Sequence, residues 1–143
     1  MDNQEVKKET ILSALKIRHV VFDKVTFIRK GFQKVSDTTN EELDFQVGVS
    51  VDKESDGEYR VTLGVLVERE DEYTAEVQVT GYCSIDENNK DKEVILKKNV
   101  VAILFPYVRS ELTLITAQPE MTPIVLPAVN INAMIDKLEK IQN

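Results

Sequence analysis

The stretch AILFPYVRSE, residues Ala102–Glu111, places apolar residues at helical spacing around a proline. On a helical wheel of about 100° per residue, one apolar strip forms on one side and a second strip lies next to it. The first strip contains Val101, Leu104, Phe105, Val108, Leu112 and Ile115, and the second contains Val100, Ile103, Tyr107 and Leu114. Because the two strips together cover about half of the circumference, they predict a long helix that is covered on two sides.

Pro106 lies inside this predicted helix. A proline in a helix interior costs about 3 kcal/mol, because its ring clashes with the carbonyl four residues back and it lacks an N–H donor. The remaining stripe of the helix is polar and includes Pro106 itself. There water or a side chain can bind the carbonyl of Ala102, so we expect the helix to bend around its core. The polar residues of the stripe are Lys98, Asn99, Arg109, Ser110, Thr113 and Thr116.

Three segments before the helix alternate apolar and polar residues, the period expected of half-buried β-strands. They are LDFQVGVSVD from Leu43, YRVTLGVLVE from Tyr59 and YTAEVQVTGYCSI from Tyr73. Asp56 and Gly57 supply turn chemistry between the first two segments, and Arg69–Glu72 forms the second tight connection. This arrangement predicts two consecutive hairpins.

An earlier segment, IRHVVFDKVTFIRK from Ile17 to Lys30, is apolar on both faces, so we expect both faces to be partly covered. Its link to Leu43 is too long for a hairpin and indicates a crossover. After the long helix, three prolines favour an extended connector, and Asn130 is a candidate cap for a short C-terminal helix. The predicted fold is α+β: a four-stranded antiparallel sheet with a long crossover, packed on one long kinked helix and a short C-terminal helix.

The composition indicates one domain spanning residues 1–143, with a less well defined N-terminal segment over residues 1–16. The chain has 42% hydrophobic and 30% charged residues and a net charge of -7, which opposes binding to nucleic acid. Cys83 has no partner for a disulfide, and no secretory or membrane-spanning segment is apparent. We therefore expect a cytoplasmic protein that does not insert into membranes.

Residues with catalytic potential are few. His19 is expected to be an ordinary strand residue, and Cys83 a small residue of the core. Zinc-ligand spacing and phosphate-binding loops are absent from the sequence, so we expect no metal, no cofactor and no enzymatic activity. Glu111 falls within the apolar arc and leaves two interpretations open. It pairs with Arg109 or with a cation at a subunit interface, or it is the base of a hot-dog-type thioesterase or ligand-binding domain.

ILFPYVRSELT, from Ile103, followed by a proline-bearing connector and LPAVNINAMI, from Leu126, resembles the SecB-type export chaperones. The resemblance extends from about Ile17 to Leu138. It implies dimers of dimers in which long helices lie between two sheets. It also implies a holdase that binds unfolded or nascent polypeptides in surface grooves without ATP and passes them to the translocase motor SecA. Divergent SecB-like proteins act as chaperones of antitoxins, which is the alternative client.

Apolar residues in the crossover and the connector are expected at the surface, where they form a client-binding groove or pack back on the sheet. The groove residues are Phe32, Val35, Phe45, Met121, Ile124 and Leu126. The expected oligomer interface consists of Val100, Ile103, Tyr107, Leu114, Val21 and Val25. The resemblance aligns Glu76 with an acidic SecA contact, whereas Lys24 and Ile28 stand where acids are usual. We therefore expect weak binding to SecA.

Overall fold

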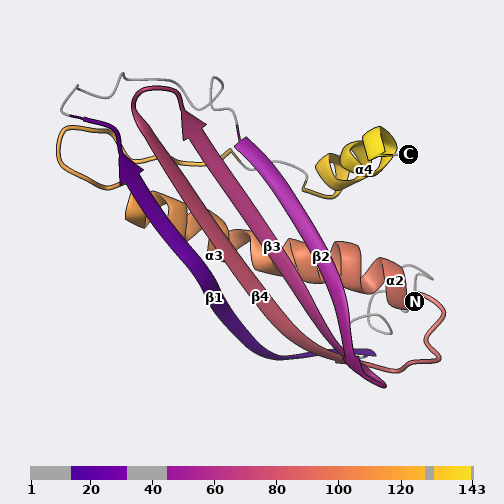
Figure 1. Ribbon diagram of the computed structural model, residues 1–143. Helices are drawn as coiled ribbons and strands as arrows, with labels where there is room; N and C mark the ends of the chain where they lie inside the picture. The colour runs from indigo at the N-terminus through magenta and orange to yellow at the C-terminus, as the bar shows by residue number, and fades with distance from the viewer. Residues whose placement is uncertain (1–13, 32–44, 128–130, 143) are drawn as a thin grey trace, which may run out of the picture.

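The computed structural model describes residues 14–31, 45–127 and 131–142 (Figure 1). Four strands are followed by a helical layer and an extended connector. The strands are β1 (Leu15–Arg29), β2 (Phe45–Ser55), β3 (Glu58–Arg69) and β4 (Tyr73–Ile85). The helical elements are α2 (Lys92–Val94), the π-helix η2 (Ile95–Val100), α3 (Val101–Ile115) and α4 (Ile131–Gln142).

The strands form one antiparallel sheet in the order β1-β4-β3-β2. The chain therefore crosses from one edge of the sheet to the other between β1 and β2, as predicted. Both predicted hairpin turns are confirmed, and each uses a residue with positive φ: Gly57 at 76° and Asp71 at 66°. Glycine adopts this conformation without the clash that a Cβ atom causes.

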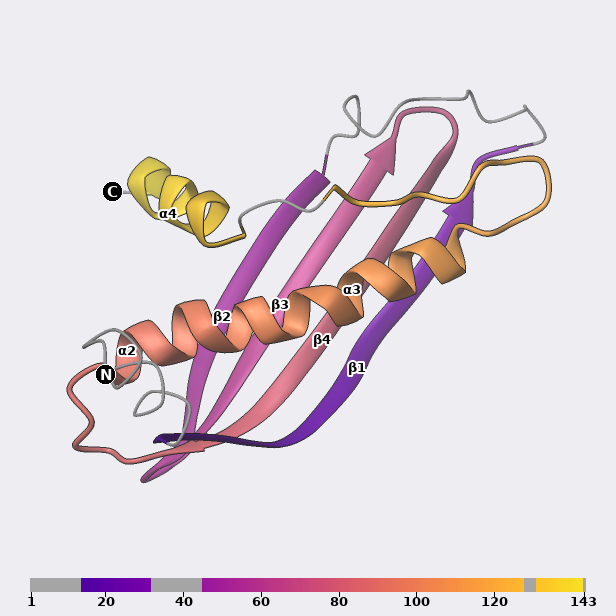
Figure 2. The ribbon, with the colours of Figure 1, turned by 180° about the vertical axis from the view of Figure 1, so that it is seen from behind.

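The helical layer covers one face of the sheet, and Figure 2 shows it crossing the strands diagonally. The first apolar strip of α3 faces the sheet as predicted, with Val101, Leu104, Phe105, Val108 and Leu112 buried. Gly81 of β4 allows the close approach, because a Cβ there would lie 3.2 Å from Leu104 Cδ2. The core forms between this strip and the inward rows of β3 and β4.

Val100 does not belong to the outward strip, so its assignment to an oligomer interface is wrong. Its side chain is 0% exposed, and its Cγ1 atom lies 3.6 Å from the Cβ position of Gly81. The prediction assumed a uniform α-helix, whereas residues Ile95–Val100 form a π-helix. The wider turns of a π-helix change the angle between successive side chains. Val100 is thereby rotated towards the sheet.

Pro106 lies inside α3 and is exposed to solvent, as the polar stripe predicted. After α3 the connector, residues 117–127, returns on the same side of the sheet towards the start of β2 (Figure 2). The predicted C-terminal helix is confirmed as α4, in which Ile131 and Ile135 are buried. Asn130 lies outside the described residues, and so do residues 1–13 of the N-terminal segment.

Candidate functional surfaces

The inward row of β2 is apolar, packs against the edge of the core and stays partly accessible. Phe45, Val47, Val49 and Val51 are only half-buried, although each pairs across the strands with a residue of β3. Those β3 partners, Val67, Val65, Leu63 and Val61, are all at most 1% exposed. The helical layer therefore covers the centre of the sheet and leaves the β2 edge partly open. Phe45, one of the predicted groove residues, lies at one end of this row.

The connector residues predicted to line a groove lie deeper than expected. Ile124 is 4% and Leu126 is 0% exposed, so their prediction as surface residues is wrong, whereas Met121 is half-buried. They pack into the core because apolar residues at alternate positions of an extended segment point to the same side. Phe32 and Val35 lie outside the described residues. Sequence reasoning missed Val125, which lies between the two buried residues and is 45% exposed.

Polar side chains of α3 hold the connector in place. Arg109 Nε donates to the carbonyl of Leu126 at 2.8 Å, and Thr113 Oγ1 donates to the carbonyl of Ile124 at 2.6 Å. The buried hydroxyl of Thr116 accepts from the Ile124 N–H at 2.8 Å. Part of the polar stripe of α3 therefore binds the connector backbone instead of water.

The second apolar strip of α3 is uncovered in the protomer. Ile103 is 40%, Tyr107 45% and Leu114 66% exposed. At about 100° per residue, this strip and the connector-binding residues lie on opposite flanks of the helix. On the edge strand β1, Val25 on the core face is 42% exposed and Val21 on the outer face is 41% exposed. The core face of β1 is partly covered as expected, but the outer face is not, since Ile28 there is also 61% exposed.

Glu111 is half-buried next to this uncovered strip. Arg109, its predicted partner, is directed to the connector, and no ion pair joins the two residues within the described part of the chain. Residues two positions apart on a helix do not face each other. The predicted pair of Glu111 with Arg109 is therefore wrong, and a cation from another subunit stays a prediction.

The outer face of the sheet is charge-balanced. Lys24 Nζ lies 3.0 Å from Glu76 Oε2, and the Arg18 guanidinium pairs with Glu58. Two weaker pairs complete the set, Arg60 with Asp52 at 3.8 Å and Lys30 with Glu68 at 3.9 Å. Each of these four acids thus faces a base, which leaves little net negative field for a basic partner.

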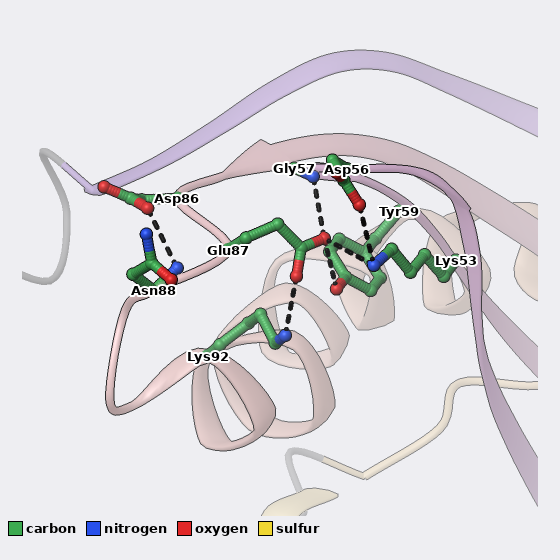
Figure 3. Close-up of polar contacts among 8 residues, drawn as sticks. All are labelled: Lys53, Asp56, Gly57, Tyr59, Asp86, Glu87, Asn88 and Lys92. Atoms are coloured by element: carbon green, nitrogen blue, oxygen red, sulfur yellow. Dashed lines mark hydrogen bonds and ion pairs between the residues drawn. The ribbon is translucent and has the colours of Figure 1, made fainter.

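A cluster centred on Glu87 ties the β2–β3 hairpin to the start of the helical layer (Figure 3). Its Oε1 atom accepts from Gly57 N and Tyr59 Oη, both at 2.7 Å, and lies 3.2 Å from Lys53 Nζ. Its Oε2 atom accepts from Lys92 Nζ at 2.9 Å. The Gly57 N–H, followed by Lys92, Tyr59 and Lys53, holds the pKa of Glu87 far below its usual range. Sequence reasoning recognised the turn but not this carboxylate.

Residues with catalytic potential occupy structural positions. His19 is exposed on β1 and meets Tyr82 edge-on, with ring centroids 6.5 Å apart. Cys83 is buried in the core as predicted, and burial raises the pKa of its thiol to about 11. Among the described residues, no group of three or more His, Cys, Asp or Glu side chains is placed to hold a metal ion. Nor is any helix of the described chain long and apolar enough to cross a membrane.

Comparison with known proteins agrees with this arrangement. The family model for SecB, described as preprotein translocase subunit SecB, matches residues 3–141. A solved structure of the Mycobacterium tuberculosis SecB-like chaperone Rv1957, in complex with a ChAD peptide from the HigA1 antitoxin, has the same fold. It superposes with a TM-score of 0.60 at 14% sequence identity and covers 90% of this chain and 99% of that one.

A curated relative is more similar over a shorter region. The Methanocaldococcus jannaschii protein MJ0357 is 37% identical over 67 residues, which span 46% of this chain and 43% of that protein. The match thus covers less than half of the relative's length.

The fold, a four-stranded antiparallel sheet covered on one face by a helical layer, is that of the SecB-like chaperone structure. The family match over nearly the whole chain shows that it belongs to the SecB family.

Proposed function

We propose that this protein is an ATP-independent holdase that binds unfolded polypeptides along β2 and the connector. The observation that carries the proposal is the half-buried apolar row of β2, which pairs with a fully buried row on β3. Apolar side chains that stay partly accessible at a sheet edge offer surface that a partner can bury. An unfolded chain offers apolar side chains that such a surface can bury.

The position of β2 supports an extended client. It is the last strand of the sheet, so within the described part of the chain no strand pairs with the backbone groups on its outer side. A peptide added to such an edge gains main-chain hydrogen bonds, while alternate side chains reach the apolar row. Main-chain bonding of this kind tolerates many sequences, as a holdase requires.

Self-association is the second part of the proposal. Ile103, Tyr107 and Leu114 on α3, with Val21 and Val25 on β1, are apolar and exposed in the protomer. A second copy that covers α3 from the side opposite the sheet would bury this strip. We propose a dimer in which Ile103, Tyr107, Leu114 and Val25, which lies on the core face of β1, form one contact. More specifically, we propose a dimer of dimers, in which Val21 on the outer face of β1 belongs to a second contact.

We infer the clients and the place of action from the resemblance to SecB proteins. We propose action in the cytoplasm on nascent or unfolded chains destined for export, with weak binding to SecA. An antitoxin segment is a second candidate client, because the related M. tuberculosis chaperone is in complex with an antitoxin peptide. We further propose that the protein has no catalytic activity.

Fluorescence anisotropy with labelled, reduced and carboxymethylated α-lactalbumin, a permanently unfolded chain, tests client binding. Val49→Thr retains shape and strand propensity but replaces a methyl group of the β2 row by a hydroxyl. We expect the Kd for the unfolded client to rise about fivefold. Val94→Thr is the matched control, since Val94 is exposed on α2 and outside the row. Absence of binding by the wild-type protein, or equal binding by the Val49 variant, would reject the proposal.

A further inference from the structure

The edge strand β1 contains two one-residue shifts of register against β4, at Arg18 and at Asp23. Such a shift is a β-bulge, and it reverses which side of the sheet the following residues face. Apolar residues of β1 face the helical layer before, between and after the two bulges. They are Leu15 and Ile17, then Val20 and Phe22, then Val25 and Phe27. The bulges thus gather most of the apolar residues of β1 on one face.

Regular pairing would turn both bulged residues towards the core. If the residues that follow each bulge kept their partners and the bulge were absent, Asp23 would face Val79 and Arg18 would face Cys83. Both of these β4 residues are 0% exposed. A charge is costly in such a position unless it is paired, so each charge opposes the regular register.

In the observed register both bulged residues instead make contacts on the outer face of the sheet. The Asp23 carboxylate accepts from the hydroxyl of Thr80, which is 2% exposed and lies 3.0 Å from the Thr62 hydroxyl on β3. The Arg18 guanidinium reaches past β4 and pairs with Glu58 on β3. Each bulge is therefore accompanied by a contact that holds its charged residue away from the core.

We propose that Asp23 selects the register of β1. A strand with apolar residues on both faces has a weakly specified register, because a shift of one residue exchanges the two faces. The charge of Asp23 excludes the regular pairing, and its contact with Thr80 stabilises the bulged one. Arg18 repeats this arrangement at the earlier bulge. Asp23 is a positioning residue, since it acts through the pairing of β1 with β4.

The selected register determines which apolar surface β1 offers to a second copy. Phe22, 41% exposed, and Val25, 42% exposed, lie on the same face of β1, on the side of the helical layer. Regular pairing would turn Phe22 to the outer face and put Asp23 on the inner one. This consequence rests on the proposed self-association, whereas the register of β1 does not depend on it.

Pairs of cysteines can report the register, because a disulfide needs two side chains that lie close together and point towards each other. In a Cys83→Ala background, His19→Cys with Tyr82→Cys reports the bulged register, in which these two residues are partners. Val20→Cys with Tyr82→Cys reports the regular register, in which Val20 would take the place of His19. With Asp23 present, we expect mild oxidation to crosslink only the first pair.

Substitution of Asp23 should change this pattern. Asp23→Val should produce the Val20 crosslink at the expense of the His19 crosslink, because valine can face Val79 without cost. Asp23→Asn should keep the His19 crosslink alone, since the amide oxygen still accepts from Thr80. Thr26→Val, which adds a valine to the outer face of β1 beyond the bulge, is the matched control and should keep the original pattern.

Two results would overturn the proposal: a Val20 crosslink with Asp23 in place, or an unchanged pattern in the Asp23→Val protein. Deletion of Asp23 covers the case in which the valine variant does not fold. Removal of the bulged residue leaves the other β1–β4 pairs in place, so this chain should fold and form the His19 crosslink. Formation of the Val20 crosslink instead, or loss of both, would contradict the bulged register.

Discussion

Lys24 on β1 neutralises Glu76 on the neighbouring strand β4, with 3.0 Å between Nζ and Oε2. The resemblance to SecB proteins predicts Glu76 as a contact to SecA. The other paired acids of the outer face lie on β2 and β3. The sheet therefore presents little uncompensated negative charge, although the whole chain carries a net charge of -7.

We expect weak or undetectable binding to a typical SecA. Charge-driven association needs an uncompensated field, and exposed charges are screened over about 10 Å at 0.1 M salt. Calorimetry against SecA at low salt measures this directly. Lys24→Glu should strengthen association by removing the base and adding an acid. Tight, salt-sensitive binding by the wild-type protein that Glu76→Lys abolishes would contradict the expectation.

Leu114→Asp should weaken self-association by at least tenfold, because a charge would be buried in the proposed interface. Leu114 is 66% exposed in the protomer, so the substitution should leave the fold intact. Light scattering coupled to gel filtration should report a dimer or tetramer for the wild-type protein and smaller species for the variant. Val94→Asp, an exposed valine outside the strip, is the control. A wild-type monomer at micromolar concentration would refute the interface.

Glu87→Gln should lower the thermal midpoint, because it removes the negative charge that pairs with Lys53 and Lys92 and replaces one of the two acceptor oxygens by a donor NH2 group. The pKa of Glu87 is lowered in the folded state, so its contribution is complete above the unfolded pKa of about 4.3 and is lost as pH falls towards the folded value. The difference in midpoint between the two proteins should be constant from neutral pH to about pH 5 and shrink in stronger acid. A difference that grows on acidification would contradict this assignment.

The strands and hairpins were predictable because their signals are local. The alternation of apolar and polar residues predicted which residues of each strand face the core. The turn residues Asp56 and Gly57 occur where the chain reverses. Cys83 and the sheet-facing strip of α3 were placed correctly for the same reason: both follow from periodicity alone.

The wrong predictions concern residues whose positions depend on irregular helix geometry or on contacts with distant parts of the chain, which local periodicity does not reveal. The π-helix before α3 changes the angular spacing and turns Val100 inward. Arg109 and Thr113 appeared to be solvent-facing, but they bind a connector that lies more than ten residues further along the chain. The sequence shows three apolar residues in the connector at positions 124–126, but not which of them points outward.

Glu111→Gln should cause no loss of thioester hydrolysis, since we expect none in the wild-type protein. Glu111 is half-buried on α3, next to the apolar strip that contains Tyr107 and Leu114. A screen with acyl-CoA substrates checks this expectation. Hydrolysis that disappears in the Gln variant would assign the protein to the hot-dog-type thioesterases instead.

Suppression of aggregation without ATP tests the central claim most directly. A chemically unfolded protein is diluted into buffer that contains this protein and no nucleotide, and light scattering follows aggregation. We expect suppression at about one assembly per client, weaker suppression by Val49→Thr, and no further effect of added ATP. Unchanged aggregation at that ratio would contradict a holdase function and leave only the SecB fold.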